Sequence, residues 1–131
     1  MRFMLFEADA AIKSQAVRAF HIDRSHALKG LQDAVGGNIE CLVSPVRQDI
    51  ICYINGDGKQ LELPRNARAE GFLRGIGVRL WDWDWISGNM VVCGVLNEQG
   101  KNDGDEHDVP EDIIEGTLEM FDMECRVWGD A

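Results

Sequence analysis

The chain contains 131 residues, of which 45% are hydrophobic and 27% are charged, and its formal net charge is −10. This composition is close to the globular average and excludes disorder of the whole chain, and the length predicts a single domain over residues 1–131. No stretch approaches the ~18–20 apolar residues that span a bilayer, and the opening MRFMLFEAD is too short for a secretory signal. The sequence therefore predicts a cytoplasmic protein that does not bind a membrane.

The first third of the chain predicts two strands and a helix. Residues 2–6 and 17–23 are short, apolar-rich runs that favour two strands joined by a polar loop. Over residues 25–35 apolar side chains recur at helical spacing, Asp23 or Ser25 can cap the first turn, and two glycines follow the last turn. We expect one helix there.

The middle of the chain predicts strands around a tight turn. The run NIECLV favours a strand that Pro45 ends. In QDIICYINGDGKQLELP, two apolar-rich runs flank residues 55–58, whose types tolerate the positive φ of a hairpin turn, and Pro64 closes the second run. Residues 65–80 hold three glycines and four arginines without a clean period, so we expect an irregular connection with room for a helical turn.

The last third predicts a buried strand, NMVVCGVL, then a polar surface loop and a second helix. Asp108 and Glu111 have the spacing of a capping box, and Pro110 suits a first helical turn. The tail MECRVWGDA is compatible with a last short strand or an unfixed end. Together the elements predict an α+β fold, a mostly antiparallel sheet of five to seven strands with two main helices at about 25–35 and 109–121.

No motif in the chain indicates a metal, a cofactor or a catalytic group. Cys41, Cys52, Cys93 and Cys125 lack the paired spacing of zinc ligands, and the first three lie in apolar runs where a reduced cysteine acts as a small buried hydrophobe. The tract NDGDEHDVPED has Asp108 where a calcium loop requires glycine. We expect no metal and no cofactor, while an enzyme whose site converges only in three dimensions stays an alternative.

The charge of the chain is concentrated in its last quarter. Residues 98–131 carry twelve acidic side chains against two basic ones, whereas residues 1–97 are balanced. An acidic loop and helix over residues 98–124 would repel nucleic acid and attract a basic protein surface. The candidate acidic surface consists of Asp103, Asp105, Glu106, Asp108, Glu111, Asp112, Glu115 and Glu119.

A second candidate site combines aromatic and basic residues. The run WDWDW places three tryptophans on one side of an extended segment, at a spacing of ~6.6 Å that admits a planar ring, although the same rings can also pack over the core. Arginines next to this run form the one basic cluster of the sequence, which internal ion pairs would equally explain. The members of this second site are Trp81, Trp83, Trp85, Arg65, Asn66, Arg68, Arg74 and Arg79.

Three ordered blocks, ALKGLQDAVGGNIE, ICYINGDGKQLELPRNARA and DWISGNMVVCG, resemble a family of small phage, plasmid and conjugative-element proteins, domain of unknown function family 3846. The resemblance covers roughly residues 20–120, and the third block fits in part because Trp85-Ile86 replaces two aliphatic residues. It implies a bacterial mobile genetic element as the genomic context and assigns no catalytic or ligand residues.

These observations favour a non-enzymatic accessory protein of a phage or related element that acts by binding. In the first hypothesis the acidic surface docks onto a host protein with a basic groove, such as a defence or nucleic-acid enzyme, without direct nucleic acid binding. In the second, the tryptophans and neighbouring arginines bind a nucleotide-like small molecule. The sequence leaves the oligomeric state open.

Overall fold

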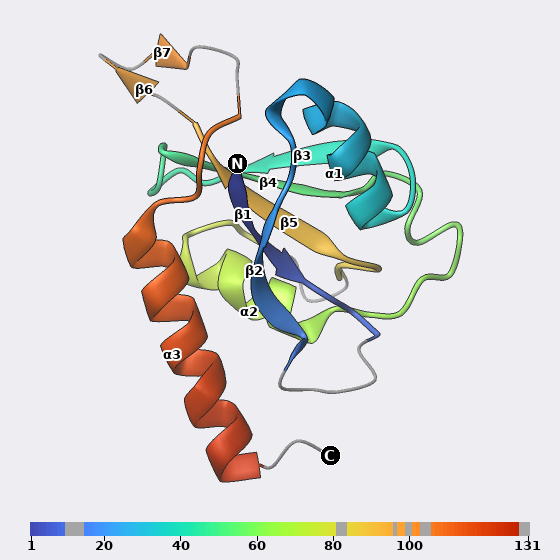
Figure 1. Cartoon of the computed structure of the whole chain (residues 1–131). Coiled ribbons are helices and arrows are strands. Elements are labelled where there is room, and N and C mark those ends of the chain that lie inside the picture. Colours follow the sequence, from blue (N-terminus) through green and yellow to red (C-terminus); the bar gives the residue numbers. More distant parts are fainter. Residues whose placement is uncertain (10–14, 81–83, 96, 99–100, 103–105, 129–131) are drawn as a thin grey trace.

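The computed structural model describes residues 1–9, 15–80, 84–95, 97–98, 101–102 and 106–128. Its main sheet has five antiparallel strands in the order β2-β1-β5-β4-β3 (Figure 1). The strands are β1 (Arg2–Phe6), β2 (Val17–His21), β3 (Ile39–Val43), β4 (Ile50–Asn55) and β5 (Met90–Gly94). The helices are α1 (Ala27–Val35), preceded by the 3-10 turn η2 (Arg24–His26), α2 (Ala67–Gly75) and α3 (Glu111–Trp128). The expected α+β fold with a mostly antiparallel sheet is confirmed.

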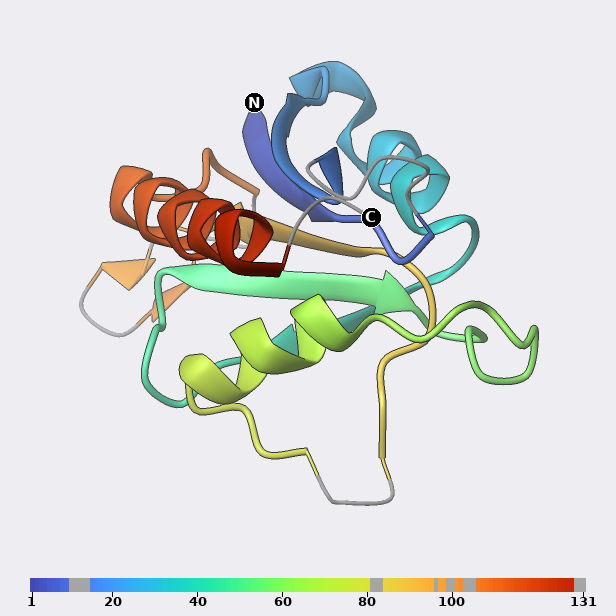
Figure 2. The same cartoon turned by 90° about the horizontal axis from the view of Figure 1, so that it is seen from below.

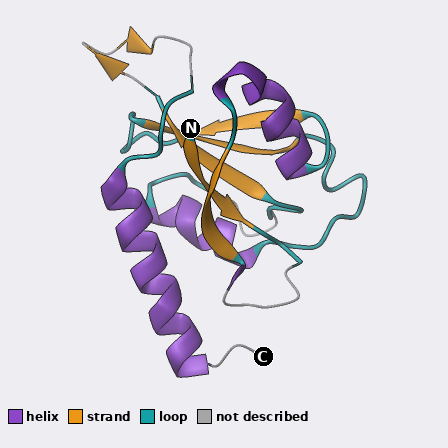
Figure 3. Ribbon diagram, in the orientation of Figure 1, coloured by secondary structure: helices purple, strands orange, loops and turns teal. Residues whose placement is uncertain are grey.

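A small hairpin projects from one end of the main sheet (Figure 3). It pairs β6 (Asn97–Glu98) with β7 (Lys101–Asn102) inside the tract expected to be a surface loop. None of the helices that the structure describes is long and apolar enough to cross a membrane.

Helices cover both faces of the sheet, which explains why its central strands are apolar throughout. Figure 2 shows α1 on one side of the strands and α2 on the other. In β1, Phe3 and Leu5 pack in the cluster with α1, whereas Met4 and Phe6 pack in the cluster with α2 and α3. Successive side chains of a strand point to opposite faces, so a strand with two covered faces buries all of them. In β5 every residue is buried.

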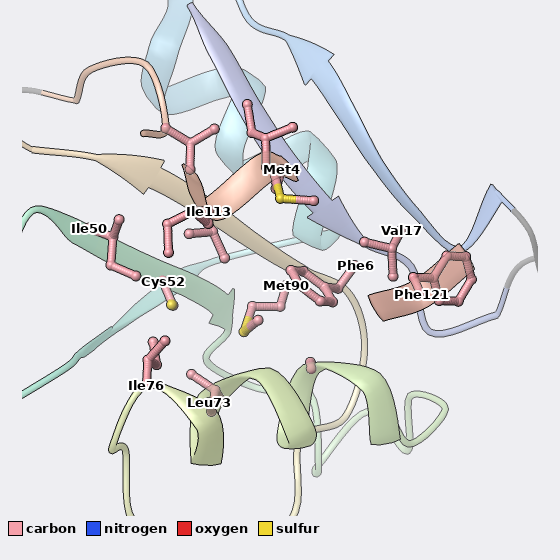
Figure 4. Close-up of a cluster of buried hydrophobic side chains, with 14 of the residues drawn as sticks. Met4, Phe6, Val17, Ile50, Cys52, Leu73, Ile76, Met90, Ile113 and Phe121 are labelled. Carbon is pink, nitrogen blue, oxygen red and sulfur yellow. The ribbon is translucent and has the colours of Figure 1, made fainter. Parts of the chain in front are cut away.

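The larger cluster lies between the sheet and the two helices α2 and α3. In Figure 4, Leu73 of α2 and Ile76, the residue that follows α2, point toward Cys52 on β4, and Phe121 of α3 lies beside Val17 on β2. Both helices therefore rest on one face of the sheet, and α3 reaches the edge strand β2.

The prediction of a hairpin over residues 50–63 is wrong. Only its first arm is a strand, β4, and residues 56–62 form consecutive turns in which Leu63 donates its backbone N–H to the carbonyl of Gly58. The reason is that β4 already pairs with β3 on one edge and β5 on the other, so neither edge is left for a third partner.

Residues 65–80 contain a regular helix, α2, where an irregular connection was expected. Asn66 caps it, because its side-chain oxygen accepts from the backbone N–H of Ala69 at 3.1 Å. The helix buries Ala69, Glu70 and Leu73. Because the buried side of α2 is narrow and two of its residues are glycine, apolar residues do not recur at a clear helical spacing in this segment of the sequence.

Three further expectations need correction at the C-terminal end and on β3. Residues 123–128 of the tail are helical rather than a strand, since α3 continues to Trp128, and residues 129–131 lie outside the described residues. Asp108 does not act as the expected cap among the described residues, because its carboxylate accepts from the backbone N–H of Arg2 at 2.8 Å. Cys41 is exposed, since β3 is an edge strand, whereas Cys52 and Cys93 are buried as expected.

Candidate functional site

Four of the predicted acidic residues contact other parts of the chain. Glu106 accepts a hydrogen bond from the hydroxyl of Tyr53 at 3.0 Å, and Asp108 accepts from the backbone of Arg2. The side chain of Arg2 also pairs with Glu111 at 3.3 Å. These contacts fix the segment before α3 against β1 and β4. Asp103 and Asp105 lie outside the described residues.

Asp112 belongs to a second internal contact, centred on Arg47. The guanidinium of Arg47 binds Asp49 with two hydrogen bonds of 2.8 and 2.9 Å and Asp112 at 2.8 Å. These hydrogen bonds lower the pKa of both carboxyl groups, so all three groups stay charged near neutral pH. This contact attaches the first turn of α3 to the β3–β4 connection.

The solvent-exposed face of α3 carries acidic side chains. Glu111, Glu115 and Glu119 follow one another at four-residue spacing, which places them in one stripe along the helix, about 6 Å apart in rise. All three are exposed. Within the part of the chain that the structure describes, Glu115 and Glu119 have no ion pair or hydrogen bond. They are the available part of the predicted acidic surface.

Two arginines of the second candidate site meet at Glu70, and a third, Arg68, makes a different contact. Arg65 binds Glu70 through two hydrogen bonds of 2.7 and 2.9 Å, and Arg74 approaches the same carboxylate at 4.0 Å. Glu70 is buried, and its pKa is lowered chiefly by the hydrogen bonds from Arg65. Arg68 instead stacks over the ring of Phe121, 4.9 Å from its centroid.

Asn66 has a structural role between α2 and the sheet. Asn66 is buried and donates to the carbonyls of Phe6 and Gly88 at 3.0 Å each, so it connects α2 to β1 and to the chain before β5. Arg79 is exposed in the segment after α2. Internal pairing, the simpler explanation offered for the basic cluster, describes Arg65 and Arg74 well.

Trp85 is the one member of the tryptophan run that the structure describes, since Trp81 and Trp83 lie outside the described residues. Its side chain is 40% exposed, and its indole N–H donates to the hydroxyl of Ser87 at 2.9 Å. The ammonium group of Lys59 lies 4.8 Å from the ring centroid and also pairs with Asp84. One face of this ring therefore already has a cationic partner.

A groove that the sequence did not reveal runs between α2 and α3. This α2–α3 groove has a volume of about 670 Å³. Its apolar lining includes Phe6, Val17, Phe72, Ile76, Ile113, Met120 and Phe121. The helices present Gly71, Gly75 and Gly116 to it, and a Cβ atom built on any of them would meet no atom within 4 Å. The only sequence signal was these glycines, placed inside helices where glycine is unfavourable.

The described cysteines and acids do not form a reactive or metal-binding group. Burial raises the pKa of Cys52 to about 12 and also raises the pKa of Cys93, so both thiols stay protonated. Desolvation, with nearby Glu106 and Glu40, raises the pKa of the exposed Cys41 as well. Among the residues that the structure describes, no three His, Cys, Asp or Glu side chains are grouped so that they could hold a metal ion.

Comparison with known proteins gives one match. A family model described as "Domain of unknown function (DUF3846)" matches residues 1–122. No curated protein and no solved structure matches the chain.

Proposed function

This chain belongs to the DUF3846 family, and we propose that it is a non-enzymatic accessory protein of a phage or related mobile genetic element that acts by binding. Its partner in this proposal is a host protein with a basic surface. A defence enzyme or an enzyme that handles nucleic acid is the natural target, because such enzymes carry cationic grooves that attract phosphates and carboxylates alike.

The observation that carries the proposal is the acidic stripe of α3. Glu111, Glu115 and Glu119 lie on one exposed face of an 18-residue helix, and Glu115 and Glu119 have no internal partner among the described residues. Carboxylates held on a helix keep fixed spacing, so they meet a cationic surface with little loss of backbone freedom.

The net charge of −10 supports the same mode of action. A field of one sign accelerates encounter with an oppositely charged partner and weakens as salt is added, since the Debye length shrinks from ~10 Å at 0.1 M to ~3 Å at 1 M. The same field disfavours direct contact with DNA or RNA.

Two variants of equal net charge test the proposal. Glu115→Gln with Glu119→Gln removes charge from the stripe, and Glu40→Gln with Glu62→Gln removes the same charge from exposed positions elsewhere. Each tagged protein is incubated with lysate of the host bacterium, washed in steps of rising salt, and its bound proteins are quantified by mass spectrometry. Binding of each retained partner is then measured with purified components.

The stripe variant should bind the partner about 5–30-fold more weakly, because two exposed charge contacts contribute ~0.5–1 kcal/mol each. The control variant should bind like the unmodified protein. Equal losses in both variants, or binding that does not respond to salt, would refute docking through the stripe.

A further inference from the structure

The outer edge of β3 is an exposed edge of the main sheet. β3 is the last strand in the order β2-β1-β5-β4-β3, and none of the described residues forms a strand on its other side. At the opposite end of the sheet, by contrast, α3 contacts the edge strand β2. The backbone groups along the outer side of β3 are therefore available to a further strand.

The register with β4 identifies the residues of β3 whose backbone groups point outward. Gly56 donates its backbone N–H to the carbonyl of Asn38 at 2.8 Å, and the antiparallel pairing continues without a bulge along all of β3. Hydrogen-bonded and non-hydrogen-bonded pairs alternate in such a ladder, so the even-numbered residues of β3 bond to β4. The N–H and C=O groups of Ile39, Cys41 and Val43 therefore point away from the sheet.

β3 lacks the features by which edge strands avoid pairing. Proline, lysine and bulges are common devices of this kind. The strand reads IECLV and has no bulge, and its one charged residue, Glu40, is not among those whose backbone points outward. Cys41 is exposed, and Val43 has 68% of its surface exposed. An apolar strand with an open edge favours a partner strand over solvent.

The sequence of β3 is complementary to a second copy of itself. When two copies pair antiparallel about a two-fold axis at Cys41, that residue faces itself, and Ile39 of each copy faces Val43 of the other. All three pairs are of the hydrogen-bonded type, so the contact has roughly six interchain hydrogen bonds. On the other face of the sheet Glu40 lies opposite Leu42, so no like charges face each other directly.

The acidic stripe of α3 lies away from this edge. α3 starts beside the β3–β4 connection, where Asp112 binds Arg47, and runs toward β2 at the opposite edge (Figure 1). Near the β3 edge the acids are Glu40 and Glu106, since the pKa of Cys41 is raised by desolvation and then by the charges of these two residues. Two copies therefore repel one another at longer range, and added salt screens that repulsion.

We propose that two copies of this chain pair through β3, so that two five-stranded sheets join into one continuous antiparallel sheet. The two-fold axis passes between the two Cys41 residues. The contact goes beyond the proposed function and is independent of it, because the acidic stripe of α3 takes no part in the pairing.

A residue that faces itself across a two-fold axis allows a specific test. Cys41→Lys and Cys41→Glu each place two like charges opposite one another, whereas an equimolar mixture of the two variants places opposite charges there. Met120→Lys and Met120→Glu make the same changes of net charge at an exposed position of α3 and serve as controls. Association of the full chain is measured by sedimentation velocity from about 10 µM to about 1 mM, and circular dichroism checks that each variant is folded.

The unmodified protein should dimerise with a Kd of roughly 10–500 µM, because a contact confined to one short strand is small for a specific interface. Each Cys41 variant alone should associate at least about tenfold more weakly, the mixture should regain the association, and the Met120 controls should behave like the unmodified protein. Association that survives in both Cys41 variants, or a mixture that associates no better than either variant alone, overturns the inference. A protein that stays monomeric up to about 1 mM also overturns it and leaves the β3 edge to an extended segment of a different protein.

Amide hydrogen exchange gives a second measurement that needs no variant. The backbone N–H groups of Ile39, Cys41 and Val43 should exchange more slowly as the concentration of the unmodified protein rises. Exchange at these three positions that does not change while the protein dimerises would place the contact elsewhere and overturn the inference.

Salt separates this inference from the proposed function. Dimerisation joins two chains of net charge −10, so added salt should strengthen it, whereas salt should weaken docking onto a basic host protein. Self-association that weakens with salt is an ionic contact and overturns strand pairing. Loss of the host partner in the Glu115→Gln, Glu119→Gln variant with an unchanged dimer supports both proposals, and each can fail while the other holds.

Discussion

Replacing the groove glycines by alanine should stabilise this protein. An interior glycine costs a helix ~1 kcal/mol relative to alanine, and a Cβ at Gly71 or Gly116 would meet no atom within 4 Å, so no packing penalty offsets the gain. The two positions lie on different helices and share no neighbour, so their effects should add to about 2 kcal/mol. For a chain of 131 residues this corresponds to roughly 6–8 °C in Tm.

Gly30 provides the matched control, because it also lies inside a helix, α1. A Cβ there would lie 2.5 Å from Cγ2 of the buried Ile22. Overpacking of this kind costs ~1–3 kcal/mol and should exceed the gain in helix propensity. Gly30→Ala should therefore destabilise the protein, although the same substitution in α2 or α3 stabilises it.

Urea unfolding followed by circular dichroism at 25 °C measures these differences as shifts in the free energy of unfolding at constant m-value. The reasoning is refuted if Gly71→Ala and Gly116→Ala lower the free energy of unfolding, because the space beside those glycines would then be occupied in the folded protein. Equal signs at Gly30 and Gly71 would also refute it, since the prediction depends on the difference in their surroundings.

Three other substitutions test the contacts that position the helices. Asn66→Ala should lower the free energy of unfolding by about 2–4 kcal/mol in urea unfolding, because it removes the cap of α2 and leaves two buried carbonyls without their donor. The hydrogen bonds from Arg65 lower the pKa of Glu70 in the folded protein below its usual value of about 4.5. The contact between Glu70 and Arg65 therefore stabilises the protein fully above pH 4.5, and this stability is lost as the pH falls through the folded pKa. Glu70→Gln should flatten the decline in Tm below about pH 5. Arg47→Ala should speed hydrogen exchange in the first turns of α3 by releasing Asp112, with a loss of about 1–2 kcal/mol in the free energy of unfolding.

The sequence correctly predicted the elements whose residue pattern alone matches the structure that they adopt in the folded protein. The end of α1 is an example, since Gly36 adopts the left-handed conformation, with φ 81°, that the pattern indicated. The strands β1 and β5 were likewise readable as unbroken apolar runs because helices cover both faces of the sheet.

The errors arose where partners distant in sequence decide the structure. The turn after Asn55 has suitable residue types for a hairpin, but β3 and β5 already occupy both edges of β4. The apolar side of α2 is narrow, and Gly71 and Gly75 face the groove, so the segment has no amphipathic period for a sequence pattern to detect. The groove itself depends on how far α2 and α3 lie apart on the sheet, which neither segment encodes locally.

The acidic surface was also predicted only in part, because ion pairs between residues distant in sequence change its charge. Counting charges along the chain identified the acidic last quarter, but Arg2 and Arg47, which lie in the balanced part of the sequence, fold back onto Glu111 and Asp112. The first turn of α3 is thereby partly neutralised, whereas Glu115 and Glu119 in the middle of the helix have no such contact among the described residues. A cationic partner should therefore gain most from the middle of α3, beside the groove, and least from the segment that precedes the helix.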